Sequence, residues 1–213
     1  MKTIDLETIS YPGKGEANED YILCRKLSDN SLIAILADGM GGLSYGADAA
    51  KIVSESIMTT IIGNLHHCCP EDVLIRAFEA ADTAISKKCK ELKCRMGAAV
   101  SVALIIDSNL YFAWQGNVRL YKVCNGELTM LNTDHIIADI EGSFLTRCVN
   151  GKGFREKIPI KHEKKDQIDR LFLCSDGFYK KINLNAIAKQ ATAITFDGTF
   201  EDDASMIDIK TGD

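Results

Sequence analysis

Four short acidic clusters, each beside a run of apolar residues, constrain what this chain can fold into. They are spread over most of its 213 residues: Asn18-Glu19-Asp20, Asp38-Gly39-Met40-Gly41-Gly42, Ser175-Asp176-Gly177 and Asp202-Asp203. Three of the neighbouring runs have the length and composition of buried β-strands: Leu32–Ala37, Leu171–Cys174 and Ala204–Ile209. Carboxylates at strand ends can converge at one edge of a sheet, where their like charges repel. The pattern therefore predicts an anionic pocket that needs cations.

The donor atoms of these clusters indicate which cations. Oxygen ligands without a matched set of Cys or His favour hard ions such as Mg²⁺ or Mn²⁺. A site of this kind can activate water for attack on a phosphate ester. The run His66-His67-Cys68-Cys69 lacks the ligand spacing of a zinc site, and its position before Pro70 is more typical of a helix end.

Composition limits the class of protein and its partners. The chain is 46% hydrophobic and 26% charged, which is ordinary for a water-soluble protein, and its length suits one domain over residues 1–213. Its net charge of −5 and the lack of a basic stripe argue against nucleic acid as a partner. No apolar run approaches the ~20 residues of a membrane span. Acidic residues near the N-terminus do not fit a signal peptide, so we expect a cytoplasmic protein in which most cysteines are small buried hydrophobes.

Hydrophobic periodicity divides the chain into many strands and a few helices. Helical spacing covers 45–62 and 71–93, with a short helix over 184–193. Strands are expected at 2–10, 20–27, 31–37, 98–107, 109–115, 118–124, 127–131, 144–150, 153–161, 168–174 and 204–210. Asn125-Gly126 is a strong hairpin signal, and Asn150-Gly151 indicates a second hairpin. Residues 161–167 read as a charged connection. These elements predict an α+β fold of two packed sheets covered by helices.

The order of the acidic motifs resembles the PPM (protein phosphatase 2C) family, in a short bacterial-type form. Supporting segments lie between the acids: Met96-Gly97-Ala98-Ala99, Gly116-Asn117-Val118-Arg119, Thr133-Asp134-His135 and Leu145-Thr146-Arg147. The resemblance implies a four-layer αββα sandwich of two antiparallel sheets flanked by helices. It also implies a centre of two Mg or Mn ions that activates water to hydrolyse phosphoserine and phosphothreonine in proteins.

Roles carried over from the family fall on matching positions of this chain. Asp38 would bridge both ions, and the Gly39 carbonyl would bind one of them. Asp176 and Asp202 would hold the other ion, while Glu19 and Asp20 would act directly or through water. Asp38 and Asp176 would thus be the central catalytic side chains. A glycine at position 39 suits this role because it allows the backbone to approach a cation closely.

The chain departs from the family pattern in several places. Asp203 replaces the Asn of the terminal pair, so either acid could be the ligand, and the alignment with the family favours Asp202. Gly15 stands where the family has a phosphate-binding Arg, so the neighbouring Lys14 is the candidate for binding substrate. Asn117 replaces an Asp that helps to hold a third ion, which makes a third ion doubtful. Only 24 residues separate Gly177 from Asp202, so we expect reduced helical cover on one side. A second copy of the chain or a partner would then shield the exposed apolar surface.

The remaining candidates have mainly structural interpretations. Asp134 and His135 are expected to form a turn near the site, Arg147 to pair with an acid, and Trp114 to pack in the core. A competing function is a catalytically weak phosphatase-like module that binds phosphoproteins or a kinase. The phosphatase reading instead implies phosphorylated protein substrates and, by family habit, a cognate serine/threonine kinase.

Overall fold

A computed structural model describes residues 4–15, 17–40, 45–139, 142–189 and 199–211. Two five-stranded sheets, both antiparallel throughout, form its centre. The first sheet has the order β10 (Ile160–Lys164), β5 (Asn109–Gln115), β4 (Ala98–Ile106), β3 (Ser31–Gly39) and β2 (Asp20–Ser28). The second has the order β1 (Asp5–Tyr11), β12 (Ala204–Lys210), β11 (Arg170–Cys174), β6 (Arg119–Cys124) and β7 (Glu127–Met130). A small hairpin pairs β8 (Ile136–Asp139) with β9 (Gly142–Leu145).

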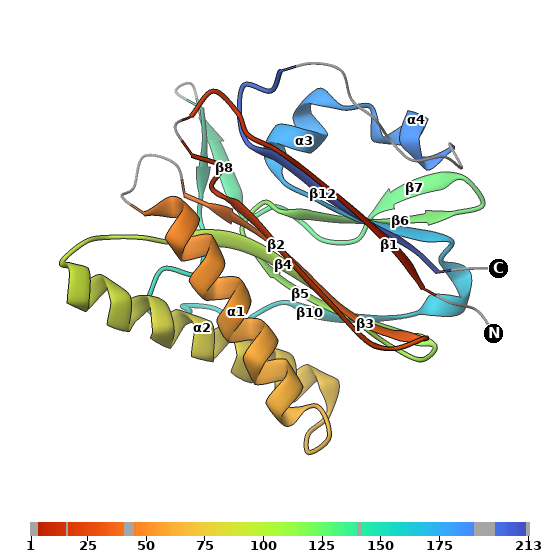
Figure 1. The fold of residues 1–213 in the computed structure, drawn as a ribbon, viewed down its shortest axis with the longest axis horizontal. Helices are drawn as coiled ribbons and strands as arrows, with labels where there is room; N and C mark the ends of the chain where they lie inside the picture. Colours follow the sequence, from red (N-terminus) through yellow and green to blue (C-terminus); the bar gives the residue numbers. More distant parts are fainter. Residues whose placement is uncertain (1–3, 16, 41–44, 140–141, 190–198, 212–213) are drawn as a thin grey trace.

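Helices cover both outer faces of this sandwich, but unequally (Figure 1). The long helices α1 (Gly46–Asn64) and α2 (Pro70–Leu92) lie on the first sheet. The second sheet is covered by α3 (Asp176–Lys181) and α4 (Leu184–Ala188), of six and five residues. The four-layer sandwich and its reduced cover on one side are therefore confirmed for the described residues. One 3-10 turn, Lys165–Gln167, precedes β11.

The alternating pattern of β3 explains why the layers pack as they do. Successive strand residues point to opposite faces, and on β3 both faces are fully buried. Ile33 and Ile35 pack in the core cluster beneath α1 and α2, whereas Leu32 and Leu36 pack in the cluster between the sheets. A third cluster, which includes Phe172 and Phe178, fills the space between the second sheet and the short helices.

The region before β10 differs most from expectation. The predicted hairpin of 144–150 with 153–161 is wrong: β9 pairs with β8, and β10 pairs with β5. The cause is a long-range contact, because the Asp82 carboxylate on α2 accepts hydrogen bonds from the backbone of the 150–153 loop. Part of the predicted charged connection 161–167 is edge strand β10, where charged side chains are well tolerated.

Other expectations agree closely with the structure. Strand β12 spans 204–210 as predicted, and β11 lies at the centre of the second sheet. Asn125 and Gly126 both have positive φ, which confirms the hairpin between β6 and β7. Helix α4 ends at Ala188, and the rest of the predicted 184–193 helix lies partly outside the described residues. Helix α3 was not predicted as a helix.

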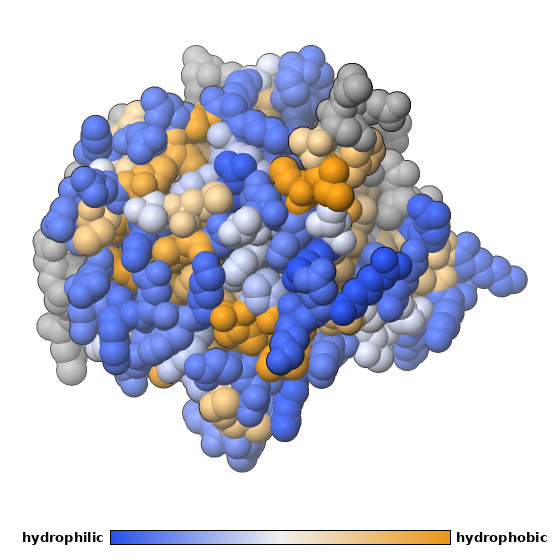
Figure 2. Space-filling view, turned by 180° about the vertical axis from the view of Figure 1, so that it is seen from behind, coloured by the Kyte–Doolittle hydropathy of each residue, from blue (hydrophilic) through white to orange (hydrophobic). Residues whose placement is uncertain are grey.

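Two surface features bear on partners. Figure 2 shows one face, on which hydrophobic surface forms separate patches between hydrophilic side chains. Among the described large hydrophobic residues, the most exposed are Ile137 and Phe144, which pair across the β8–β9 hairpin. The second copy of the chain stays a prediction. No helix in the described part of the chain has the length and hydropathy needed to cross a bilayer.

Candidate active site

The strands bring the N-terminal acids of the site together. Asp20 begins β2 and lies directly opposite Asp38, near the end of β3. Opposing residues of antiparallel strands have their side chains on the same face. The Ser175 hydroxyl, from the second sheet, donates a hydrogen bond of 2.8 Å to Asp20 Oδ2 and so links the two sheets here. The acidic clusters that contain Asp20, Asp38 and Asp176 therefore meet at one end of the sandwich.

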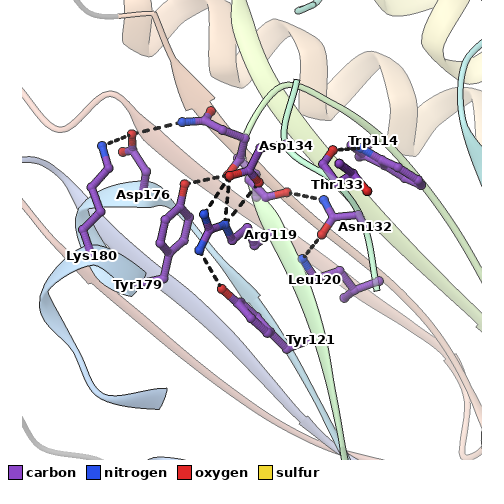
Figure 3. A network of polar contacts seen from close by, with 12 residues as sticks. Trp114, Arg119, Leu120, Tyr121, Asn132, Thr133, Asp134, Asp176, Tyr179 and Lys180 are labelled. Atoms are coloured by element: carbon purple, nitrogen blue, oxygen red, sulfur yellow. Dashed lines mark hydrogen bonds and ion pairs between the residues drawn. The ribbon is translucent and has the colours of Figure 1, made fainter. Parts of the chain in front are cut away.

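Asp176 is held at this end by two donors. It is the first residue of α3, directly after Ser175. Its Oδ2 accepts hydrogen bonds from the Asn117 amide at 3.0 Å and from the Lys180 ammonium at 2.7 Å (Figure 3). Asn117 is thus placed beside the acids, where it offers an amide donor to a carboxylate.

The acidic pair before β12 divides into two roles. Asp203 accepts the Gly13 N–H at Oδ1, at 2.7 Å, and the Glu19 N–H at Oδ2, at 2.6 Å. Its carboxylate is therefore occupied in tying the loop before β2 to the start of β12. Asp202 is exposed, and its only described side-chain hydrogen bond comes from the Asp203 N–H, at 3.0 Å. Of the two, Asp202 has the carboxylate that is available to a ligand.

Two glycines let these loops approach one another. A Cβ on Gly39 would lie 2.3 Å from the Gly46 carbonyl oxygen, and a Cβ on Gly177 would lie 2.3 Å from the Asp203 carbonyl oxygen. Both distances are far shorter than a Cβ tolerates, so any side chain here would push the backbone of β3 or α3 away from its neighbour. Packing around the acids thereby explains Gly39 of the second motif and Gly177 of the third.

The acids raise one another's pKa values. Burial raises the pKa of Asp20 to about 7, and the charges of Asp203 and Asp176 act in the same direction, against hydrogen bonds from Ser175 and Ser205. Burial and the charge of Asp20 raise the pKa of Asp38 well above its ordinary value. Glu19 and Asp202 have pKa values raised by burial first and then by nearby carboxylates. Negative charge is concentrated here without enough positive charge to balance it.

This arrangement suits divalent cations in its chemistry. The donors are carboxylate oxygens, and Asp20 Oδ1 is a buried oxygen without a hydrogen-bond partner. As the side chains lie, no group of three or more His, Cys, Asp or Glu among the described residues is close enough to hold an ion. Asp176 in particular is turned toward Asn117 and Lys180. The residues therefore fit a hard cation, and binding one would require these carboxylates to turn toward it.

A second polar network supports the site from behind (Figure 3). The Arg119 guanidinium binds both oxygens of Asp134 and lies 3.8 Å from the ring centre of Tyr179. The Tyr179 hydroxyl donates to the Asn117 carbonyl oxygen at 3.2 Å. His135 Nδ1 accepts the Gly116 N–H at 3.1 Å. Asp134 and His135 therefore have the structural role that was predicted, and they fix the strand connection that carries Asn117.

Comparisons with known proteins agree with this geometry. The family model described as protein phosphatase 2C matches residues 10–202. The chain belongs to the protein phosphatase 2C family. A probable protein phosphatase 2C from Arabidopsis thaliana is 32% identical over 126 residues, which cover 58% of this chain and 32% of that protein. The chain thus spans about a third of that relative.

Solved structures of this family share the fold. The serine/threonine phosphatase Stp1 from Staphylococcus aureus superposes with a TM-score of 0.78 at 19% identity, covering 99% of this chain and 97% of the other. The catalytic domain of the serine/threonine phosphatase PstP, in complex with two manganese ions, superposes with a TM-score of 0.76 at 19% identity over both whole chains. The family model confirms the predicted family, whose enzyme class is protein phosphatase, and the superpositions confirm the predicted fold.

The other phosphatase-motif residues have definite places. Lys14 is exposed and forms an ion pair of 2.6 Å with Glu201, next to Asp202, at the rim of the acidic group. Arg147 pairs with Glu156, and Trp114 is buried with its ring nitrogen donating to the Thr133 carbonyl oxygen, both as predicted. The sequence did not reveal the parts played by Ser175, Asp203 and Lys180, although all three adjoin or belong to the acidic motifs.

Proposed function

We propose that this protein hydrolyses phosphoserine and phosphothreonine in proteins, with water activated at a centre of two Mg²⁺ or Mn²⁺ ions. The observation that carries the proposal is the gathering of Asp20, Asp38, Asp176 and Asp202 at one end of the sandwich, where burial and mutual repulsion raise the pKa values of Asp20, Asp38 and Asp202. Membership of the protein phosphatase 2C family supports the reaction class.

The proposed ligands are Glu19, Asp20, Asp38, the Gly39 carbonyl, Asp176 and Asp202. Asp38 would be the bridging residue, since it lies directly opposite Asp20 and close enough to the other acids that, after burial, the charges of Asp20, Asp176 and Asp202 raise its pKa further. Two bound ions would supply the positive charge that lowers the pKa of water and offsets charge on the phosphoryl oxygens. Asp203 keeps its structural contacts with Gly13 and Glu19.

The protein's own groups hold the reacting parts in position. Ser175 fixes the orientation of Asp20 through its hydroxyl, and the Arg119–Asp134–Tyr179 network fixes Asn117 beside Asp176. Lys14 is the proposed contact for the substrate phosphate. Its ion pair with Glu201 joins two exposed side chains, and such pairs are weak in water, so an incoming phosphate can replace Glu201. Asn117 carries no charge, so we propose that a third ion binds weakly or not at all.

The second candidate function is a catalytically weak module that binds phosphoproteins or a kinase. One observation favours it: Asp176 is already satisfied by Asn117 and Lys180. Both donors contact Oδ2, so an ion that binds this oxygen must compete with the Asn117 amide and the Lys180 ammonium. The kinase partner and the cytoplasmic location stay predictions.

A hydrolysis assay separates the two functions. The substrate is a phosphothreonine peptide, assayed with Mn²⁺, with Mg²⁺ and with a chelator. Hydrolysis that requires the ion and is lost in Asp38→Ala supports the phosphatase. Tight binding of the peptide with no hydrolysis, or hydrolysis unchanged in Asp38→Ala, supports the binding module instead. Lys180→Ala, which frees Asp176 from one partner, should strengthen ion binding if Lys180 competes with the ion.

A further inference from the structure

A half-open pocket of about 850 Å³ lies beside the acidic group. Its walls are the C-terminal half of α2 with the residues that follow it, and the segment 145–156. Met40, which directly follows Asp38 and Gly39, lines its inner end together with Gln115. We call this pocket the cationic trough, because of the side chains described next.

The charges of the trough are opposite to those of the centre. Its lining includes Lys90, Arg95, Arg147, Lys152 and Arg155, against the single acid Glu156. Glu156 is already paired with Arg147. The other four cations are exposed and form no ion pair with any described residue. In a chain of net charge −5, four uncompensated cations around one pocket create a local positive potential that attracts anions.

The wall that carries Lys152 is held rigidly. Asp82 on α2 is buried, and its carboxylate accepts N–H groups of Asn150 at 3.3 Å, Gly151 at 2.7 Å and Gly153 at 2.7 Å. The loop packs so closely on α2 that a Cβ on Gly151 would lie 2.6 Å from the Ser86 nitrogen. A binding wall that is ordered in advance loses less entropy when a ligand arrives.

The inner end of the trough contains an unused donor. Gln115 is 1% exposed, and its side-chain Nε2 has no hydrogen-bond partner. A buried polar donor without a partner is costly, and an oxygen of a bound anion would satisfy it. Gln115 stands two residues before Asn117, which contacts Asp176. The trough and the acidic group are therefore connected through the same strand end.

We propose that the cationic trough binds a second anionic group of the phosphoprotein, a phosphate or a cluster of carboxylates, near the residue being dephosphorylated. The inference rests on the proposed phosphatase function. A peptide whose phosphoresidue is at the centre must leave along the adjoining surface, and the trough offers it four unpaired cations and an unpaired amide. A peptide segment is favoured over a free anion because the cations stand on both walls of a pocket of about 850 Å³, and Met40 in its lining is only two residues from Asp38.

The test compares peptides that differ only in their second charge. The reference peptide has one phosphothreonine among neutral residues. The others add either three glutamates or a phosphonate that cannot be hydrolysed, two to five residues away on either side. At ~3.4 Å per residue, these spacings sample about 7–17 Å along the trough. We expect the best of them to raise kcat/KM about tenfold, the effect of one charge-assisted contact.

Charge reversal in the trough should invert the preference. In Lys152→Glu/Arg155→Glu, the ratio of the two kcat/KM values should fall from about ten to below one. The matched control is Arg25→Glu/Lys26→Glu, which reverses one Arg and one Lys that are exposed on β2 and form no ion pair within the described part of the chain. The control has the same net charge and should keep the tenfold ratio. An equal loss in both double variants would reflect net charge alone and would overturn the inference.

A binding measurement separates failure of the trough from failure of the proposed function. A fluorescent peptide carrying only the phosphonate is titrated in the presence of a chelator, so no hydrolysis is needed. Binding by the parent chain and the control, but not by the trough variant, supports the site even if no peptide is hydrolysed. Hydrolysis of the reference peptide without any preference or phosphonate binding leaves the phosphatase intact and overturns the trough.

Discussion

The acidic centre and the cationic trough are neighbours, but they differ in the sign of their charges and in how far the charged side chains are buried. In the centre, Asp20 and Asp38 are largely withdrawn from water beside the more exposed Asp202, and burial raises the pKa of Asp20 to about 7. The trough spreads its cations on exposed side chains, which remain fully hydrated. Buried charges of like sign destabilise the fold until a counter-ion neutralises them. Exposed charges are hydrated, so they do not need a permanent partner. The comparison indicates a permanent need for cations in the centre and a reversible need for anions in the trough.

The largest expected effect comes from neutralising the bridging acid. Asp38→Asn should reduce hydrolysis of a phosphothreonine peptide by about 10³-fold or more, because ion binding and charge stabilisation are both lost. Since the pKa of Asp38 is raised in the fold, the charged form destabilises the ion-free protein at neutral pH. The variant should therefore melt at a higher temperature than the parent chain in a chelator. A lower melting temperature there would contradict the account of the centre.

Substitutions of the two acids before β12 should have different effects, one on ion binding and the other on stability. Asp202→Asn should weaken Mn²⁺ binding about tenfold or more with little change in ion-free stability, because its carboxylate has few protein partners. Asp203→Ala leaves the Gly13 and Glu19 N–H groups without an acceptor and should cost about 1–3 kcal/mol of unfolding free energy. Isothermal titration with Mn²⁺ and urea unfolding measure the two effects. The reverse assignment, with Asp203 as the ligand, would show the opposite pattern.

In the trough, the largest effect on stability should come from Asp82. Asp82→Ala removes the acceptor of three backbone N–H groups and should cost about 2–4 kcal/mol. It should also abolish the preference for a second anionic group, because the wall that carries Lys152 loses its anchor. Glu79→Ala, an exposed position on the same helix, is the matched control and should change neither quantity. If Asp82→Ala still prefers peptides with a second anionic group, the ordered wall is not needed for binding that group.

The smallest expected effect is a dependence on pH at the boundary of the two regions. Burial and the charge of Arg147 lower the pKa of His135 to about 4. The unfolded chain, with a pKa of about 6.5, binds a proton between these values that the folded chain does not. The stability contributed by neutral His135 is thus complete above about pH 6.5 and is lost as the pH falls toward about 4.

The variant His135→Asn tests this contribution. The asparagine oxygen can still accept the Gly116 N–H, but it has no proton to gain in this range. Thermal melting at pH 7 and pH 5 should show a smaller loss of stability on acidification in the variant than in the parent chain. Equal losses in the two proteins would mean that His135 does not stay neutral in the fold.

The centre could be predicted from the sequence because local patterns encode it. Its acids adjoin short apolar runs such as 204–210, and antiparallel pairing brings strand ends to one edge. The choice of Asp202 over Asp203 rested on the family pattern, and the hydrogen bonds of Asp203 now give it a physical reason. What no local pattern shows is the link from Ser175 to Asp20, because 155 positions separate them.

The trough could not be predicted, since nothing in the sequence groups its cations. Lys90 lies in the last turn of α2 and Arg95 follows this helix, while Lys152 and Arg155 belong to a segment that local turn signals assign to a hairpin. The incorrect prediction of a hairpin at Asn150-Gly151 has the same cause, a contact between residues far apart in the sequence. An isolated Asn-Gly favours a tight turn, but Asp82, almost 70 residues away, offers three backbone contacts that a hairpin does not.

The most direct test of the central claim is the number and position of Mn²⁺ ions bound by the purified protein. Crystals soaked in Mn²⁺ should show two anomalous peaks, roughly 3.5–4 Å apart, on either side of the Asp38 carboxylate. Asp176 and Asp202 should then have turned onto the second ion, with Lys180 released. Peaks absent from this end of the sandwich, or a single ion that does not touch Asp38, would contradict the account.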